Sequence, residues 1–269
     1  MNQDVHGTQS WVDLGSPDVR ASKAFYRGLF GWGSYTLTLD EFGDYEILTE
    51  PASDQGIAGV QALVDDTQSP SWTCTFRVHD VDACVRTVEA AGGRLRVDPM
   101  PVAHLARVAH FADPQGAEFG VWQPITAGGR SPIGERSAAR FVELACRDVA
   151  GAERFYREVF GWSTVEAGAG GFGTRWTVDG ELVATGIATG AVDAPTGEDG
   201  DGSAAPPPQW TPYFEVADCD AATGRAVELG AEIRSAPADT DMGRFATLTD
   251  PTGVRFAVIA AGGPEPHRS

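Results

Sequence analysis

The chain of 269 residues carries 38 acidic and 20 basic side chains, which gives a formal net charge of −18. Such an acidic surface repels phosphate backbones and anionic lipid, so we expect neither nucleic acid nor a membrane as a partner. With 42% hydrophobic residues the chain can bury a sizeable core, and its length suits one large domain or two of ordinary size.

The first predicted elements are a strand at 10–15 and a helix at 18–30. Asp18 is placed to cap this helix, Phe25 and Leu29 recur along it at helical spacing, and Gly31 ends it. Strands are then expected near 34–40, 44–50 and 57–64. After a polar loop the same order begins again, with a strand at 72–78, a helix at 81–91 and strands near 94–97, 106–111 and 117–123.

The whole arrangement recurs in the second half of the chain. Asp148–Trp162 matches Asp18–Trp32 at eight of fifteen positions. The repeat distance is too long for a solenoid, so we interpret the repeat as a duplicated domain. The second half is predicted to contain strands near 140–146, 163–167, 173–179, 182–189, 210–216, 231–234, 244–248 and 254–260, with helices at 149–160 and 221–229.

A second repeated motif, Asp-Pro-x-Gly, precedes the closing strand of each half, at Asp113 and at Asp250. Pro presets φ and Gly supplies a positive φ, so the motif predicts a tight turn between two strands. The segment 190–209 is rich in Gly, Pro and acidic residues and is predicted to be a flexible loop. The predicted boundaries are a first domain at 1–124, a linker at 125–139, a second domain at 140–262 and a tail at 263–269.

These motifs carry a resemblance to a known family. A strand, then D-x₆-F-Y-x₃-F-G-W, then D-P-x-G before a closing strand, is similar to the vicinal oxygen chelate superfamily of glyoxalases, bleomycin-resistance proteins and extradiol dioxygenases. In particular, the chain resembles the tandem two-domain actinobacterial members. The resemblance implies an α+β fold in which tandem βαβββ modules form two curved mixed sheets with helices on the convex faces. Each concave face would then form a cleft.

The resemblance also implies where a metal ion would be held. Metal-dependent relatives place His or Gln in the first strand, His in the strand after the mid-domain loop and Glu in the closing strand. The corresponding residues here are Trp11, Thr73 and Gly120 in the first half and Phe141, Thr211 and Ala257 in the second. None of the six is a suitable ligand, so we expect no metal cofactor. The alternative is a divalent metal held by an unconventional set that includes Glu118 or Glu143.

Strand alternation indicates which residues face the clefts. His110 titrates near working pH, and with Asp13 and Glu118 on the same face it completes the predicted catalytic acid/base set. A structural role for His110 is the alternative. The predicted substrate-binding residues are Trp11, Trp122, Thr73, Arg77, Phe141, Glu143, Tyr213 and Arg255. An aromatic cleft with carboxylates suits a small aromatic or cationic ligand. Equally, the aromatic residues could hold the two halves together.

Three functions remain open. The first is a metal-independent tailoring enzyme of secondary metabolism that carries out proton transfer as an isomerase, lyase or cyclase. The second is a resistance or binding protein that sequesters a drug or metabolite. The third is a metal-dependent glyoxalase or dioxygenase with unconventional ligands. In each case we expect a monomer or homodimer.

The four cysteines form no C-x-x-C pair, so we expect free thiols in a reducing cytoplasm. The sequence shows no apolar window of membrane-spanning length, and its first residues lack a basic segment followed by an apolar run. We therefore expect a cytoplasmic protein.

Overall fold

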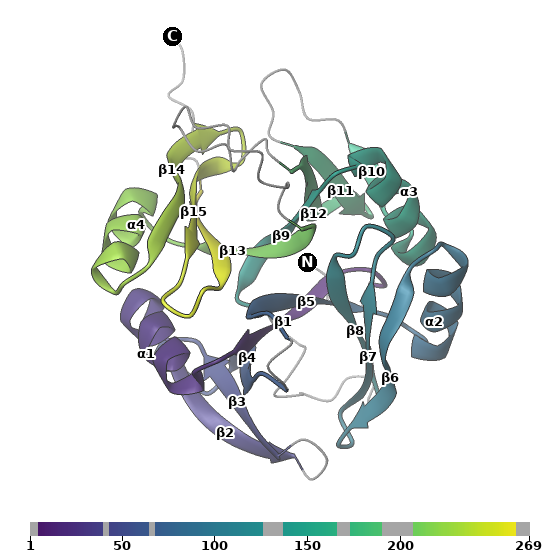
Figure 1. Ribbon diagram of the computed structural model, residues 1–269, viewed down its shortest axis with the longest axis horizontal. Helices are drawn as coiled ribbons and strands as arrows, with labels where there is room; N and C mark the ends of the chain where they lie inside the picture. Colours follow the sequence, from purple (N-terminus) through teal and green to yellow (C-terminus); the bar gives the residue numbers. More distant parts are fainter. Residues whose placement is uncertain are drawn as a thin grey trace.

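The computed structural model describes residues 5–39, 43–64, 68–125, 137–165, 173–189 and 207–261. In these residues it contains two eight-stranded curved sheets and four helices, so the predicted α+β architecture of tandem βαβββ modules is confirmed (Figure 1). The linker predicted at 125–139 and the loop predicted at 190–209 lie for the most part outside the described residues. The tail predicted at 263–269 lies wholly outside them.

The first half forms one mixed sheet with the strand order β2-β3-β4-β1-β5-β8-β7-β6. Strand β1 runs parallel to β4 and β5 runs parallel to β8, whereas the other neighbours are antiparallel. Its elements are β1 (Gln9–Ser16), α1 (Val19–Phe30), β2 (Gly33–Leu39), β3 (Gly43–Thr49), β4 (Gly56–Ala62), β5 (Ser71–Arg77), α2 (Val81–Ala90), β6 (Arg94–Val102), β7 (Ala106–Ala112) and β8 (Glu118–Pro124).

The second half repeats this topology, with the strand order β10-β11-β12-β9-β13-β16-β15-β14. The two parallel contacts, between β9 and β12 and between β13 and β16, fall at the equivalent places. Its elements are β9 (Ala139–Cys146), α3 (Val149–Phe160), β10 (Ser163–Val165), β11 (Thr174–Val178), β12 (Glu181–Ala188), β13 (Gln209–Glu215), α4 (Cys219–Glu228), β14 (Glu232–Thr240), β15 (Gly243–Thr249) and β16 (Arg255–Ala260).

Side-chain caps set the helix starts. The carboxylate of Asp18 accepts a hydrogen bond of 2.9 Å from the Ala21 amide at the start of α1. Helix α4 starts at Cys219, two residues before the predicted position, because Asp218 caps it in the same way. At the other end of α1, Gly31 has φ 73°, a left-handed conformation that glycine adopts without strain.

Two strands are longer than predicted. Strands β6 and β14 each continue several residues past the expected ends at 97 and 234, through segments that contain Pro99, Pro101 and Pro237. Proline lacks an amide hydrogen and usually ends a strand. Each of these strands is the last in its sheet, so one side has no partner strand and the missing donors can be tolerated there.

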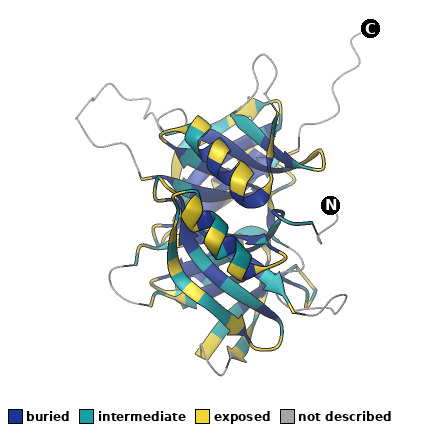
Figure 2. Ribbon diagram, turned by 90° about the vertical axis from the view of Figure 1, so that its right-hand side faces the viewer, coloured by how far each residue is buried: buried dark blue, intermediate teal, exposed yellow. Residues whose placement is uncertain are grey.

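The two halves pack together through their helix-bearing convex faces. Helix α1 contacts α4, and α2 contacts α3, across the boundary between halves (Figure 1). One continuous hydrophobic cluster joins both halves, and within it the rings of Phe76 and Trp162 lie 5.3 Å apart. The helices carry exposed residues on their outward sides, and the central strands beneath them are mostly buried (Figure 2). No helix among the described residues has the length and apolar content needed to span a membrane.

The two repeated motifs lock the halves together crosswise. From the first half to the second, the Tyr26 hydroxyl donates to the Asp250 carboxylate at 3.0 Å and accepts from the Trp72 indole at 3.0 Å. In the other direction, Tyr156 donates to Asp113 at 3.2 Å and accepts from the indole of Trp210. Each aspartate thus both shapes its own Asp-Pro-x-Gly turn and receives a tyrosine from the opposite half.

The concave faces of the two sheets lie on opposite sides of the shared core (Figure 1). Their side chains form two hydrophobic clusters that are separate from the shared core. Four aromatic residues expected on the concave faces belong to these clusters: Trp11 and Trp122 in the first, Phe141 and Tyr213 in the second. The interpretation in which these aromatic residues hold the two halves together is therefore wrong.

Candidate functional site

The first concave cluster is built from both ends of the curved sheet, which we call its two arms: β2 and β3 form one arm, and β6 and β7 form the other. Trp11 and Trp122 form its floor and are only 1% and 4% exposed. Side chains from the two arms pack against them: Tyr35, Leu37, Tyr45 and Ile47 from β2 and β3, and Val102, Leu105, Ala106 and Val108 from β6, β7 and the turn between them. The face is thus lined by aromatic and aliphatic side chains that pack against one another, and we refer to this concave face below as the first cleft.

A partly buried carboxyl group lies in this cleft. One oxygen of Asp13 accepts hydrogen bonds from the Tyr45 hydroxyl and from the Trp11 indole at 3.1 Å, and the same indole lies 2.9 Å from the Tyr45 oxygen. Burial raises the pKa of Asp13 to about 6, although both hydrogen bonds favour the carboxylate. Burial and the nearby Asp13 charge raise the pKa of Tyr45 well above its usual range. Asp13 can therefore exchange a proton near neutral pH.

Gly59 makes this contact possible. It lies directly beside Asp13 in the parallel pair of β4 and β1. A Cβ atom at Gly59 would overlap both the Tyr45 hydroxyl and the Asp13 carboxylate. Only glycine leaves the space through which Tyr45, from β3, reaches Asp13 on β1. Tyr45 and Gly59 were not predicted as site residues, because their part in the cleft depends on the pairing of β1, β3 and β4.

His110 faces the same cleft from the opposite arm. It is paired with Gly120 on β8 and is mostly buried, which lowers the pKa of its imidazole. None of the described residues hydrogen-bonds its ring. Three strand spacings separate it from Asp13, which amounts to about 14 Å along the sheet. His110 and Asp13 therefore do not touch, and a small molecule between the arms would meet each of them separately.

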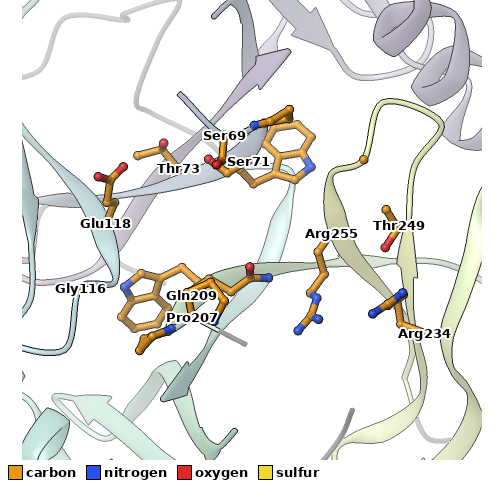
Figure 3. A pocket seen from close by; sticks show the side chains of 15 residues that line it. Ser69, Ser71, Thr73, Gly116, Glu118, Pro207, Gln209, Arg234, Thr249 and Arg255 are labelled. Atoms are coloured by element: carbon orange, nitrogen blue, oxygen red, sulfur yellow. The ribbon is translucent and has the colours of Figure 1, made fainter. Parts of the chain in front are cut away.

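The third predicted catalytic residue, Glu118, lies elsewhere. Its side chain is 58% exposed and forms an ion pair with Arg96 at 3.2 Å. Glu118 lies away from Asp13 and His110, because it is the first residue of β8 and is therefore at the end of that strand. Together with two predicted binding residues, Thr73 and Arg255, it lines a pocket between the halves (Figure 3). Arg77 is half-buried on β5 beside Trp122.

The second concave face carries an equivalent carboxylate with different partners. Glu143 is only 4% exposed and accepts hydrogen bonds from the Tyr213 hydroxyl at 3.0 Å and from Thr185 at 3.5 Å. The ring of Phe141 stacks on Tyr213, with centroids 4.5 Å apart. Thr185 takes the place that Gly59 has in the first half. The tyrosine that donates to the carboxylate is Tyr213 on β13, whereas in the first half it is Tyr45 on β3.

The residues at the metal positions of the superfamily do not fit a metal ion. Strand pairing places Thr75, not Thr73, between Trp11 and Gly120, and Tyr213, not Thr211, between Phe141 and Ala257. Thr75 and Tyr213 supply no set of metal donors either. Within the described ranges, no three His, Cys, Asp or Glu side chains are grouped to hold a metal ion.

Comparisons with known proteins agree with this architecture. A model of the glyoxalase/bleomycin resistance protein/dioxygenase superfamily matches residues 8–121, and a model of the glyoxalase-like domain matches residues 141–259. The chain is 35% identical over 274 residues to anthracycline biosynthesis protein DauV of Streptomyces sp. (strain C5), covering 96% of this chain and 95% of that protein. It is 30% identical over 261 residues to putative glyoxylase CFP32 of Mycobacterium tuberculosis, covering 94% of each.

Solved structures show the same fold at low sequence identity. The Mn(II)-bound glyoxalase from Novosphingobium aromaticivorans aligns with a TM-score of 0.60 and 17% identity, covering 98% of this chain and 86% of that one. At this identity the likeness establishes the fold alone.

Proposed function

The chain belongs to the glyoxalase/bleomycin resistance protein/dioxygenase superfamily, and we propose that it converts a small organic molecule of secondary metabolism by metal-independent proton transfer in the first concave cleft. The observation that carries this proposal is the Asp13 carboxyl group, which is held by Tyr45 and Trp11 and has a pKa of about 6. A general base works best when its pKa lies near the operating pH.

The reaction needs no oxidant or metal. The Asp13 carboxylate takes a proton from a carbon next to a carbonyl group, so the C–H bond breaks, an O–H bond forms and the electron pair enters the enolate. Return of the proton to another atom of the enolate completes an isomerisation. The hydrogen bonds from Tyr45 and Trp11 to one carboxylate oxygen hold the group in place, and the other oxygen takes the proton. His110, neutral because burial lowers its pKa, is a second proton acceptor on the opposite arm.

The proposed substrate is a planar polycyclic aromatic molecule with such a carbonyl group. Two relatives are named as anthracycline biosynthesis proteins. Anthracyclines are planar polycyclic molecules with carbonyl groups. The partly buried rings of Tyr35 and Tyr45 on this concave face suit contact with a flat ring system.

The test is deuterium exchange in D₂O. An anthracycline aglycone is incubated with the protein, and incorporation of deuterium next to its carbonyl groups is followed by mass spectrometry. We expect exchange to accelerate with the wild type, to rise with pH through about 6 as Asp13 ionises, and to fall about a hundredfold in Asp13→Asn. The matched control is Asp44→Asn, which removes an exposed carboxylate on the strand that carries Tyr45.

A sequestering protein is the second candidate function, because the net charge of −18 favours a cationic guest. It predicts that tryptophan fluorescence reports binding of the aglycone in both wild type and Asp13→Asn, while the compound is recovered without deuterium. That result would refute the proton-transfer proposal and favour sequestration.

A further inference from the structure

Each of the two sheets ends in two edge strands, and three of these four edges are protected against pairing with another strand. Strand β6 contains Pro99 and Pro101, and β14 contains Pro237. Both strands also carry charged side chains along their length: Arg94, Arg96 and Asp98 on β6, and Glu232, Arg234 and Asp239 on β14. Strand β10 has only three residues. Prolines, charges and short length are means by which proteins keep a sheet edge from adding a foreign strand.

The fourth edge, β2, has none of these protections. Its sequence from Gly33 to Leu39 contains no proline and no charged residue. All seven residues pair with β3 in one uninterrupted register, so the strand is regular along its whole length. It lies at the outer rim of the first sheet, and in the described part of the chain no strand pairs with its outer side (Figure 1). The duplication has therefore left one long, unprotected edge, because the equivalent strand β10 is short.

The side chains on the exposed face of β2 are small and neutral. Ser34, Thr36 and Thr38 are exposed there. The hydroxyls of the two threonines donate to Glu46 and Asp44 on β3, at 2.8 and 2.9 Å, which holds β2 beside β3. The edge is thus a fixed strand whose outward backbone groups can pair with a further strand.

An edge of this kind suits a second copy of the same chain. Two β2 strands related by a twofold axis run antiparallel, and each supplies the amide donors and carbonyl acceptors that the other needs. Because β2 carries no charge, this pairing sets no like charges directly opposite each other, although each chain has a net charge of −18. Hydroxyl side chains also pair favourably with one another across antiparallel strands.

We propose that the chain forms a homodimer in which β2 of one copy pairs antiparallel with β2 of the second copy. The first sheets of the two copies then become one continuous sheet. Tyr35 and Leu37 lie on the concave face of β2 and line the first cleft, so the same strand of the partner extends the rim of that cleft. The interface depends on the backbone edge and not on Asp13, so it stands or falls independently of the proposed proton transfer.

Sedimentation velocity at increasing protein concentration, up to about 1 mM, tests the proposal, because a contact between two seven-residue strands is small and a weak dimer is expected. Physiological ionic strength, with a Debye length of about 8 Å, screens the repulsion between the two acidic chains. We expect the average mass to rise towards that of a dimer, and hydrogen exchange of the β2 amides to slow over the same range of concentration. A protein that stays monomeric at about 1 mM, or a dimer in which the β2 amides exchange as in the monomer, would overturn the proposal without any substitution.

Substitutions then locate the interface. The double variant Thr36→Lys/Thr38→Lys puts like charges on the paired edge and should weaken self-association about tenfold or more. Its lysines can pair with the carboxylates that the threonines contact, so β2 should remain folded, as circular dichroism will check. Ser163→Lys/Val165→Lys makes the same change at exposed positions of β10 and is the matched control, which should self-associate like the wild type. Asp13→Asn should also do so, which separates the interface from the proposed chemistry. Unchanged self-association in the β2 variant, or equal weakening in the β10 variant, would contradict pairing through β2.

Discussion

Replacing Asp13 by asparagine should stabilise the folded protein above pH 6, even though it removes the proposed catalytic base. The reason is the raised pKa of the carboxyl group in its partly buried position. Burial therefore makes the charged form of Asp13 destabilise the folded state, whereas the protonated form does not. Asparagine keeps an acceptor for the Tyr45 and Trp11 donors but carries no charge.

The size of this gain in stability follows from the change in the pKa of Asp13 from 3.8 to about 6 on folding. This difference of about 2 pH units corresponds to about 3 kcal/mol, at 1.36 kcal/mol per unit. Below pH 3.8 Asp13 is protonated in both states, and the wild type lacks this penalty. As the pH rises to 6 the unfolded chain ionises first, so the wild type loses stability progressively. Above pH 6 the penalty is complete and constant.

Urea unfolding at a series of pH values from 3.5 to 8 measures the effect. The free-energy difference between Asp13→Asn and wild type should grow by up to about 3 kcal/mol between pH 4 and pH 6 and then level off. Asp44→Asn should show no comparable growth, since Asp44 is exposed. A difference that does not depend on pH, or a variant that becomes relatively less stable as pH rises, would refute the reasoning.

Three further outcomes are expected. Gly59→Ala should reduce deuterium exchange about a hundredfold, because the added methyl group displaces Tyr45 from Asp13; full activity would contradict that role. Tyr156→Phe should lower the free energy of unfolding by about 1–3 kcal/mol, since the buried Asp113 loses a donor from the other half; urea unfolding measures it, and an unchanged midpoint would argue against the crosswise link. Prolonged dialysis against EDTA should leave the exchange activity unchanged, and its loss with recovery on adding one metal would disprove the metal-independent proposal.

Local chemistry in the sequence determined the elements and the faces of the strands. Asp18 and Asp148 cap helices through amides three residues away, and alternation along β1 directs Trp11 and Val12 to opposite sides of the sheet. The repeat of these signals also predicted the duplication. Such features depend on residues that are neighbours in the chain, so they can be inferred from spacing alone.

The tertiary structure alone decided which distant residues meet. Tyr26 bonds Asp250 of the opposite half, Tyr45 reaches Asp13 over Gly59, and Glu118 faces the pocket between the halves rather than His110. The sequence motifs identified several of these residues but not the residues that they contact. Strand register and the docking of the two convex faces set these contacts, and both depend on packing summed over the whole core rather than on any local signal.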